Sequence, residues 1–319
     1  MTAAVGAVLT LGETLGSFRS HGRITAGTEF GLAVAGAESN VAIALARLGH
    51  PVAWGGRVGD DPVGRLVLTT LRGEGVDVTG AIVDQTAPTA TMVVEDRHPL
   101  PPSVTYYRAG SAGSRLDADL AARAVAGAQP RVLHLSGITP ALSAQAAAAV
   151  SVAIDAARQV RGAAVCFDVN YRARLWNRAD AARALTPVAV SADIVVASAD
   201  ELPLVAEGSS TEERAAALRE AGVSTVVVKH GKRGAESFGP DGHVECPAHP
   251  VTEVDSIGAG DAFVGGYLSA LLDGLDEAAR LRRGAALGAL AVTGRGDWER
   301  LPSRAELAVF LAGAEEAER

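Results

Sequence analysis

The stretch Asp255-Ser256-Ile257-Gly258-Ala259-Gly260-Asp261 carries the most information about the fold, and an apolar run over 262–268 follows it. The two glycines let the backbone turn several N–H groups toward one point. The apolar run predicts a helix whose positive end faces the same point. The sequence therefore predicts an anion-binding turn that leads directly into a helix.

The carboxylate of Asp261, at the end of this turn, has two interpretations. It either caps the helix by accepting hydrogen bonds from unpaired N–H groups, or it acts as a general base. A base would take a proton from a hydroxyl group while the turn holds a phosphoryl group in transfer. A Gly-x-Gly-Asp sequence before a long apolar helix is more than a cap requires, and we therefore favour the base.

The composition places the chain among large globular proteins. It has 319 residues, of which 48% are hydrophobic, enough for one large α/β domain. A net charge of −8 and scattered Lys and Arg predict no nucleic-acid partner. Cys166 and Cys246 fit no metal or redox spacing. No basic leader begins the chain, and no apolar run reaches ~18 residues without a charge, so we expect a cytoplasmic protein without a membrane partner.

From residue 40 onward, predicted strands and helices alternate, which is typical of a three-layer or doubly wound α/β fold. We expect a single domain over 1–319. The predicted helices are 40–48, 61–73, 262–272 and 277–293, and the predicted strands are 52–58, 131–135, 163–169, 194–197 and 225–229.

Two segments, 22–35 and 89–108, interrupt the alternation. Both consist of short extended pieces punctuated by Gly and Pro, and neither contains a helix that could cross over a sheet. Such pieces favour a small β-sheet lid over a ligand cleft, or an edge sheet used in dimerisation.

Polar residues follow several of these elements. Gly36 permits close approach of a ligand, and Asn40 either caps a helix or bonds sugar hydroxyls through its amide. Asp168 and Arg172 end a buried strand, where they either face a ligand cleft or pair with each other. Arg108, on the predicted lid, is either a solvated charge or, with Arg172, one of two forks for a substrate carboxylate.

Three further positions keep two interpretations each. Glu201 either orients a metal-bound water near phosphates or begins a helix. The segment 229–234 either lines the phosphates of a nucleotide or forms a basic hairpin turn. Asp297 either forms a loop turn or accepts a substrate hydroxyl.

Missing motifs exclude several classes of enzyme. The sequence has no P-loop, no Gly-x-Gly-x-x-Gly after its first strand and no Gly-x-Ser-x-Gly elbow. It also has no His-Glu-x-x-His pair that would support a zinc site.

The paired motifs around Asn40 and Asp261 resemble the two signatures of the ribokinase-like (PfkB) carbohydrate kinases. The resemblance is closest to the 2-keto-3-deoxygluconate kinases and covers nearly the whole chain. Its further motifs are Tyr106-Tyr107-Arg108-Ala109-Gly110-Ser111-Ala112, His134-Leu135-Ser136-Gly137-Ile138-Thr139-Pro140, Asp168-Val169-Asn170-Tyr171-Arg172 and Arg295-Gly296-Asp297.

The resemblance implies a three-layer α/β/α sandwich with a β-sheet lid. It also implies transfer of the ATP γ-phosphoryl group to a primary hydroxyl of 2-keto-3-deoxygluconate. Asp261 would be the base, and the N–H groups of Gly258, Ala259, Gly260 and Asp261 would form an anion hole. The implied sugar-binding residues are Gly36, Ala37, Asn40, Tyr106, Arg108, Arg172, Asp255 and Asp297. The implied nucleotide-binding residues are Asn170, Arg172, Ser198, Lys229, Gly231, Gly234, Gly258 and Gly260, with Glu201 reaching Mg²⁺ through water.

The resemblance also implies ATP and Mg²⁺, with a monovalent cation such as K⁺. The exposed edge of the predicted lid, by itself, favours a homo-oligomer formed by pairing of two lids. Two rival hypotheses remain at this point. One is a kinase of a neutral sugar such as fructose or ribose, and the other is a sensor of sugars or nucleotides that lacks catalysis.

Overall fold

The computed structural model describes residues 8–97, 100 and 102–317. An eight-stranded sheet forms its centre, in the order β14-β13-β12-β11-β10-β9-β1-β4, and its last six strands are parallel to one another. The antiparallel β13 and β14 extend one edge. The strands are β1 Val8–Leu11, β4 Val52–Gly55, β9 Val132–Ser136, β10 Ala164–Asp168, β11 Ile194–Ser198, β12 Thr225–Lys229, β13 Ala235–Gly239 and β14 Gly242–Cys246.

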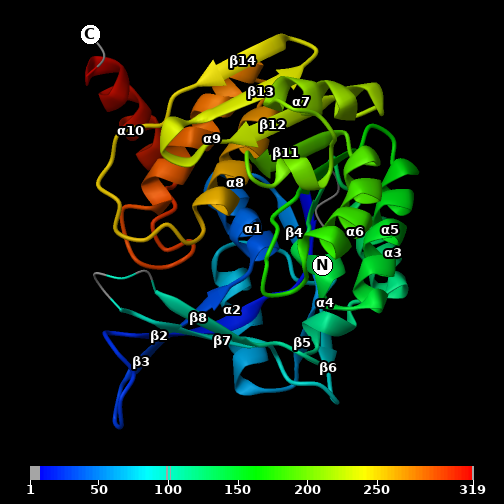
Figure 1. Cartoon of the computed structure of the whole chain (residues 1–319). Coiled ribbons are helices and arrows are strands. Elements are labelled where there is room, and N and C mark those ends of the chain that lie inside the picture. The colour runs from blue at the N-terminus through cyan, green and yellow to red at the C-terminus, as the bar shows by residue number, and fades with distance from the viewer. Residues whose placement is uncertain (1–7, 98–99, 101, 318–319) are drawn as a thin grey trace.

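Helices cover both faces of this sheet (Figure 1). Alternate strand residues point to opposite faces, so Val8 packs into one hydrophobic cluster and Leu9 into the other. On the Val8 side lie α1 Ala37–Arg47, α2 Pro62–Gly73, α8 Ala259–Leu272, α9 Glu277–Ala291 and α10 Arg304–Ala317; on the Leu9 side lie α3 Ala118–Ala128, α5 Ala144–Arg158, α6 Arg178–Val190 and α7 Thr211–Glu220. The expected three-layer fold is confirmed. In the described part of the chain, no helix is both long and apolar enough to cross a membrane.

A second sheet, which we call the lid sheet, lies beneath the central sheet in Figure 1. Its strands run in the order β3-β2-β7-β8. They are β2 Leu15–Ser20, β3 Phe30–Ala35, β7 Thr91–Glu95 and β8 Ser103–Tyr107. Leu15, Met92 and Val94 form the centre of its small buried face. The predicted segments 22–35 and 89–108 thus contain three of its four strands, although residues 98, 99 and 101 lie outside the described residues.

The structure differs from the sequence analysis in three places. Strands β1 and β2 both precede residue 22, a part of the chain for which no element was predicted. The predicted strand 52–58 breaks at Gly56, where a Cβ atom would come within 2.2 Å of the Trp54 ring. Its two halves, β4 and β5 Arg57–Gly59, therefore belong to different sheets, and β5 pairs with β6 Ile82–Asp84. Helix α1 begins before Asn40 with Gly36 as its N-cap, so Asn40 is not the cap.

Candidate active site

Two cavities meet at the start of α8. The first, of about 520 Å³, lies between the lid sheet and the ends of β10, β11 and β12. The second, of about 620 Å³, lies beside α8 and α9. Both are lined by Lys229, Gly231, Ser256 and Gly260. Because the carboxyl ends of parallel strands are where open α/β sheets bind ligands, this junction is the candidate active site.

The structure brings nearly all of the predicted site residues to this junction. The first cavity is lined by Gly36, Ala37, Asn40, Tyr106, Arg108, Asn170, Arg172, Ser198, Glu201, Lys229, Gly231, Gly258, Gly260, Asp261 and Asp297. The second is lined by Lys229, Gly231, Gly234, Ala259 and Gly260. Asp255 lies outside both linings, and its side chain accepts a hydrogen bond from Arg19 of the lid sheet.

Asp261 occupies the first turn of α8, and its buried carboxylate is held by two amides. Asn40 donates to Oδ2 at 2.8 Å, and Asn170 donates to Oδ1 at 3.2 Å. Gly258 caps the helix with a left-handed φ of 79°. The first N–H groups of a helix have no acceptor within it. The Ala259 N–H has a long contact of 3.4 Å to the Ser256 carbonyl oxygen, and the Gly260 and Asp261 N–H groups are available to an anion.

The backbone of Asn170 and the side-chain oxygen of Asn40 are each unusual at this contact. Asn170 adopts a φ of 39°, a conformation that is uncommon for a residue other than glycine. The Asn40 Oδ1 atom is buried and finds no hydrogen-bond donor among the described residues. A buried acceptor without a partner is costly, so Asn40 suits a ligand that supplies a hydroxyl proton.

Lys229 marks the border between the two cavities. Its ammonium group pairs with the Asp168 carboxylate at 2.9 and 3.0 Å. Asp168 therefore pairs with Lys229, and the internal Asp168–Arg172 pairing that we considered is wrong. Burial raises the pKa of Asp168 to about 6, and the nearby ammonium group opposes this rise. Burial also disfavours the charge of Lys229, but Asp168 and Glu201 outweigh it and raise its pKa, so it stays charged.

The first cavity contains two arginines in different states. Arg108 forms an ion pair with the buried carboxylate of Glu13, with its Nε donating at 2.7 Å, and stacks on the Tyr106 ring at 4.9 Å. Arg172 is exposed at the cavity wall, and no carboxylate of the described residues pairs with it. Arg172 is therefore the arginine that is open to an incoming anion.

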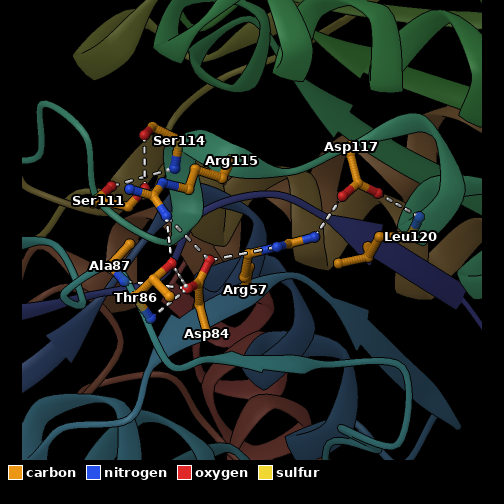
Figure 2. Close-up of polar contacts among 9 residues, drawn as sticks. All are labelled: Arg57, Asp84, Thr86, Ala87, Ser111, Ser114, Arg115, Asp117 and Leu120. Atoms are coloured by element: carbon orange, nitrogen blue, oxygen red, sulfur yellow. Dashed lines mark hydrogen bonds and ion pairs between the residues drawn. The ribbon is translucent and has the colours of Figure 1, made fainter.

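A polar network holds the loop that follows Arg108 (Figure 2). Arg57 lies between two carboxylates and donates to Asp84 at 3.4 Å and to Asp117. Arg115, in the same loop, ion-pairs with Asp84 at 3.7 Å. The loop thereby presents Ser111, whose hydroxyl donates to Glu13 at 2.7 Å. Ser111 thus links the network in Figure 2 to Glu13, and Glu13 in turn pairs with Arg108 at the first cavity.

Glu201 uses both carboxylate oxygens on the backbone. The N–H groups of Tyr171 and Ser198 each donate to it at 2.8 Å. The carboxylate therefore ties together the loops after β10 and β11. Glu201 also lines the first cavity, and each of its oxygens keeps a lone pair that no backbone N–H uses.

Three charged residues at the site were missed by the sequence reasoning. Glu13 follows β1 and Arg19 lies in β2, and we had placed no strand there. Glu38 lies in the first turn of α1 and lines the first cavity. It accepts hydrogen bonds from Ser136 at 2.7 Å and Thr139 at 2.8 Å. Burial raises the pKa of Glu38 to about 7. The sequence feature that could have pointed to Glu38 is its position between Gly36 and Asn40, two predicted sugar-binding residues.

Comparisons with known proteins agree with this geometry. The model of the pfkB family of carbohydrate kinases matches residues 5–304. The chain is 36% identical to a 2-dehydro-3-deoxygluconokinase of Bacillus subtilis over 95% of both chains. It is 38% identical to a protein of the same name from Thermoproteus tenax, over 87% of this chain and 85% of that one.

A solved structure agrees as well. The putative ribokinase II of E. coli, in complex with ATP and Mg²⁺, superimposes with a TM-score of 0.88 at 26% identity, covering 97% of this chain and all of that one. The site combines a buried carboxylate, the start of a helix and two adjoining cavities, an arrangement that suits phosphoryl transfer to a sugar. The chain is a carbohydrate kinase and belongs to the pfkB family.

Proposed function

We propose that the protein transfers the γ-phosphoryl group of ATP to the primary hydroxyl of 2-keto-3-deoxygluconate. The observation that carries this proposal is the junction of two cavities at one helix start, with Asp261 on the side of the first cavity. The names of the two relatives support the sugar, since both are called 2-dehydro-3-deoxygluconokinases.

In the proposed reaction, the sugar occupies the first cavity with its primary hydroxyl at Asp261. Asp261 takes the hydroxyl proton while the hydroxyl oxygen bonds to the γ-phosphorus. The bond from this phosphorus to the β–γ bridging oxygen breaks, and ADP leaves. The N–H groups at the start of α8 stabilise the charge on the transferring phosphoryl group.

The nucleotide occupies the second cavity. Its wall is largely apolar and includes Val251, Phe263 and Val292, which suits the flat base of ATP. Lys229 and Gly260, at the border of the two cavities, face the phosphate chain. Gly234 has a φ of 106°, and a Cβ atom there would lie 2.1 Å from the Cys246 carbonyl oxygen, so this position requires glycine.

The acid end of the sugar binds at Arg172. A guanidinium group without a protein partner binds a carboxylate in bidentate fashion and stays charged at any working pH. Arg108 already neutralises Glu13, so in this proposal it shapes the cavity together with Tyr106 and takes a secondary part in holding the acid. Gly36 lets the sugar approach the backbone, and Asp297 accepts a sugar hydroxyl.

The cofactor is Mg²⁺ bound with ATP, and it would neutralise phosphate charge during transfer. Glu201 fits the expected indirect role, because its oxygens accept backbone N–H groups and keep lone pairs for a water molecule. A monovalent cation such as K⁺ stays an expectation from the family resemblance.

We further propose that two copies associate through the lid sheet. Four large apolar side chains are exposed on or beside it: Ile24, Phe30, Leu32 and Tyr107. Its two edge strands, β3 and β8, carry three of them. A second lid sheet would cover these side chains and the strand edges. Leu32→Asp should then convert a dimer to a monomer in light-scattering measurements, and an unchanged mass would exclude this interface.

The proposed reaction is tested by measuring ADP release with Mg²⁺-ATP and a panel of sugars. The panel contains 2-keto-3-deoxygluconate, 2-keto-3-deoxygalactonate, gluconate, fructose and ribose. Preference for the keto-deoxy acids supports the proposal. Preference for fructose or ribose keeps the kinase and rejects the role of Arg172.

A further inference from the structure

Arg19 connects the lid sheet to the anion-binding turn of the body. It lies in β2, and its guanidinium group crosses to two carboxylates on separate loops. Nη1 donates to Asp255 at 2.7 Å and Nη2 donates to Asp297 at 3.0 Å. Asp255 begins the segment that leads into the turn, and the Asp297 backbone lies against Gly258, within 2.1 Å of where a Cβ atom would be. The two carboxylates therefore flank the turn.

The carboxylates of Asp261 and Asp297 lie close together and repel each other. The Asn40 amide nitrogen lies 2.8 Å from Asp261 and 3.5 Å from Asp297, so one amide group touches both carboxylates. Burial raises the pKa of Asp297 to about 6, Arg19 opposes this rise, and Asp261 and Glu299 add to it. Burial also disfavours the charge of Arg19, but its two carboxylate partners raise its pKa, so Arg19 stays positive.

We propose that Arg19 is a positioning residue that holds the Asp255 and Asp297 carboxylates beside the anion-binding turn and supplies the positive charge that keeps Asp297 ionised while β2 lies against the body. Its guanidinium group is the lid's contribution to the charge balance of the phosphoryl-transfer site. The site is thus complete only when β2 lies against the body. This inference rests on the proposed sugar phosphorylation, but it does not depend on which sugar is used.

A purely structural role for Arg19 makes a different prediction. A second ion pair, from Arg295 to Asp96 at 2.7 Å, also joins the body to the lid region, but it lies at the surface. If Arg19 were only a tether, losing either pair would loosen the lid in the same way. If Arg19 acts on Asp297, only its loss changes the pH at which the site loses activity.

The experiment compares Arg19→Gln, Arg19→Lys and Arg295→Met, using the best sugar of the wild-type enzyme. We measure kcat/KM from pH 5 to pH 9 and the melting temperature. Arg19→Gln should lower kcat/KM by about 10- to 100-fold. The low-pH side of the kcat/KM profile, which we call the acid limb, should also move upward by about one pH unit, because Asp297 then protonates at a higher pH.

The two other variants complete the test. Arg19→Lys keeps the charge and should restore the position of the acid limb, although a single ammonium group cannot bridge both acids as well. Arg295→Met should leave the acid limb in place. An acid limb that stays put in Arg19→Gln, or moves equally in Arg295→Met, overturns the inference. A wild-type enzyme inactive on every sugar would instead count against the proposed function.

Discussion

Asn40 and Asp261 are 221 positions apart in the sequence, and the amide of one donates a 2.8 Å hydrogen bond to the carboxylate of the other. This contact joins the start of α1 to the start of α8. It uses the amide nitrogen of Asn40 and leaves its Oδ1 atom to a ligand. The same contact orients Asp261, so that the second oxygen faces Asn170. The Asp261 carboxylate, our proposed base, is therefore held from two sides before any substrate binds.

Asp261→Asn should lower kcat by about 10²- to 10⁴-fold, because the variant keeps the shape of the side chain and loses the base. Binding of ATP, measured by calorimetry, should be nearly unchanged, because the nucleotide cavity does not depend on this carboxylate. The melting temperature checks that the variant is folded. Retained turnover would remove Asp261 from the mechanism.

Arg172→Met should raise KM for the sugar acid by about 10- to 100-fold, because a charged hydrogen-bonded pair is lost. The KM for any neutral sugar that the enzyme phosphorylates should stay nearly the same. Arg174→Met is the matched control, since Arg174 is exposed in the same loop and lies outside the cavity lining. An equal loss on acid and neutral sugars would contradict the carboxylate role.

Arg108→Met should lower the stability of the protein as well as its activity. Glu13 is buried, and removing its partner leaves an uncompensated charge, which costs about 3–5 kcal/mol in the free energy of unfolding. The double variant Arg108→Met with Glu13→Gln should recover much of this loss. Urea unfolding at pH 7 gives the free energy of unfolding of the wild type, the single variant and the double variant. If the double variant is no more stable than the single one, the ion pair is not what Arg108 contributes.

Glu38→Gln should stabilise the protein at high pH and have little effect at low pH. Burial raises the pKa of Glu38 from 4.5 to about 7 in the folded state. The folded protein therefore holds an extra proton between these values, and the stability that this proton contributes is lost as the pH rises through about 7. The stability gained by the variant should grow between pH 4.5 and pH 7, up to about 3 kcal/mol, and then level off. Thermal unfolding of the wild type and the variant across this pH range measures the difference in their stability. A difference that does not change with pH would contradict the raised pKa.

Gly258→Ala should damage both stability and turnover. The residue has a φ of 79°, and an added Cβ would lie 2.1 Å from the Asp297 carbonyl oxygen. We expect a loss of about 1–3 kcal/mol in stability and of roughly 100-fold in kcat, because the anion-binding turn must shift. Gly274→Ala is the control, because its φ is 75° and nothing lies within 4 Å of the added atom. Equal losses in both variants would show that the backbone conformation alone matters.

Most of the fold could be predicted from local patterns. The alternation of helices and strands after residue 40 was clear, because strands buried on both faces are continuous apolar runs. The start of the chain was missed because β1 and β2 are short and are separated by Gly12, Glu13 and Thr14. The break at Gly56 was also hidden, because it depends on where the Trp54 ring packs.

The sequence by itself determined the candidate catalytic residues of the turn, since glycines, an acid and an apolar helix must be adjacent in the chain to form an anion-binding turn. The tertiary structure alone decided which charges meet. The partners of Asp168, Arg108 and Asp255 are Lys229, Glu13 and Arg19. These ion pairs join separate strands and loops, and local spacing cannot reveal them, because they form only when the lid sheet and the strand ends are brought together by burial of the core.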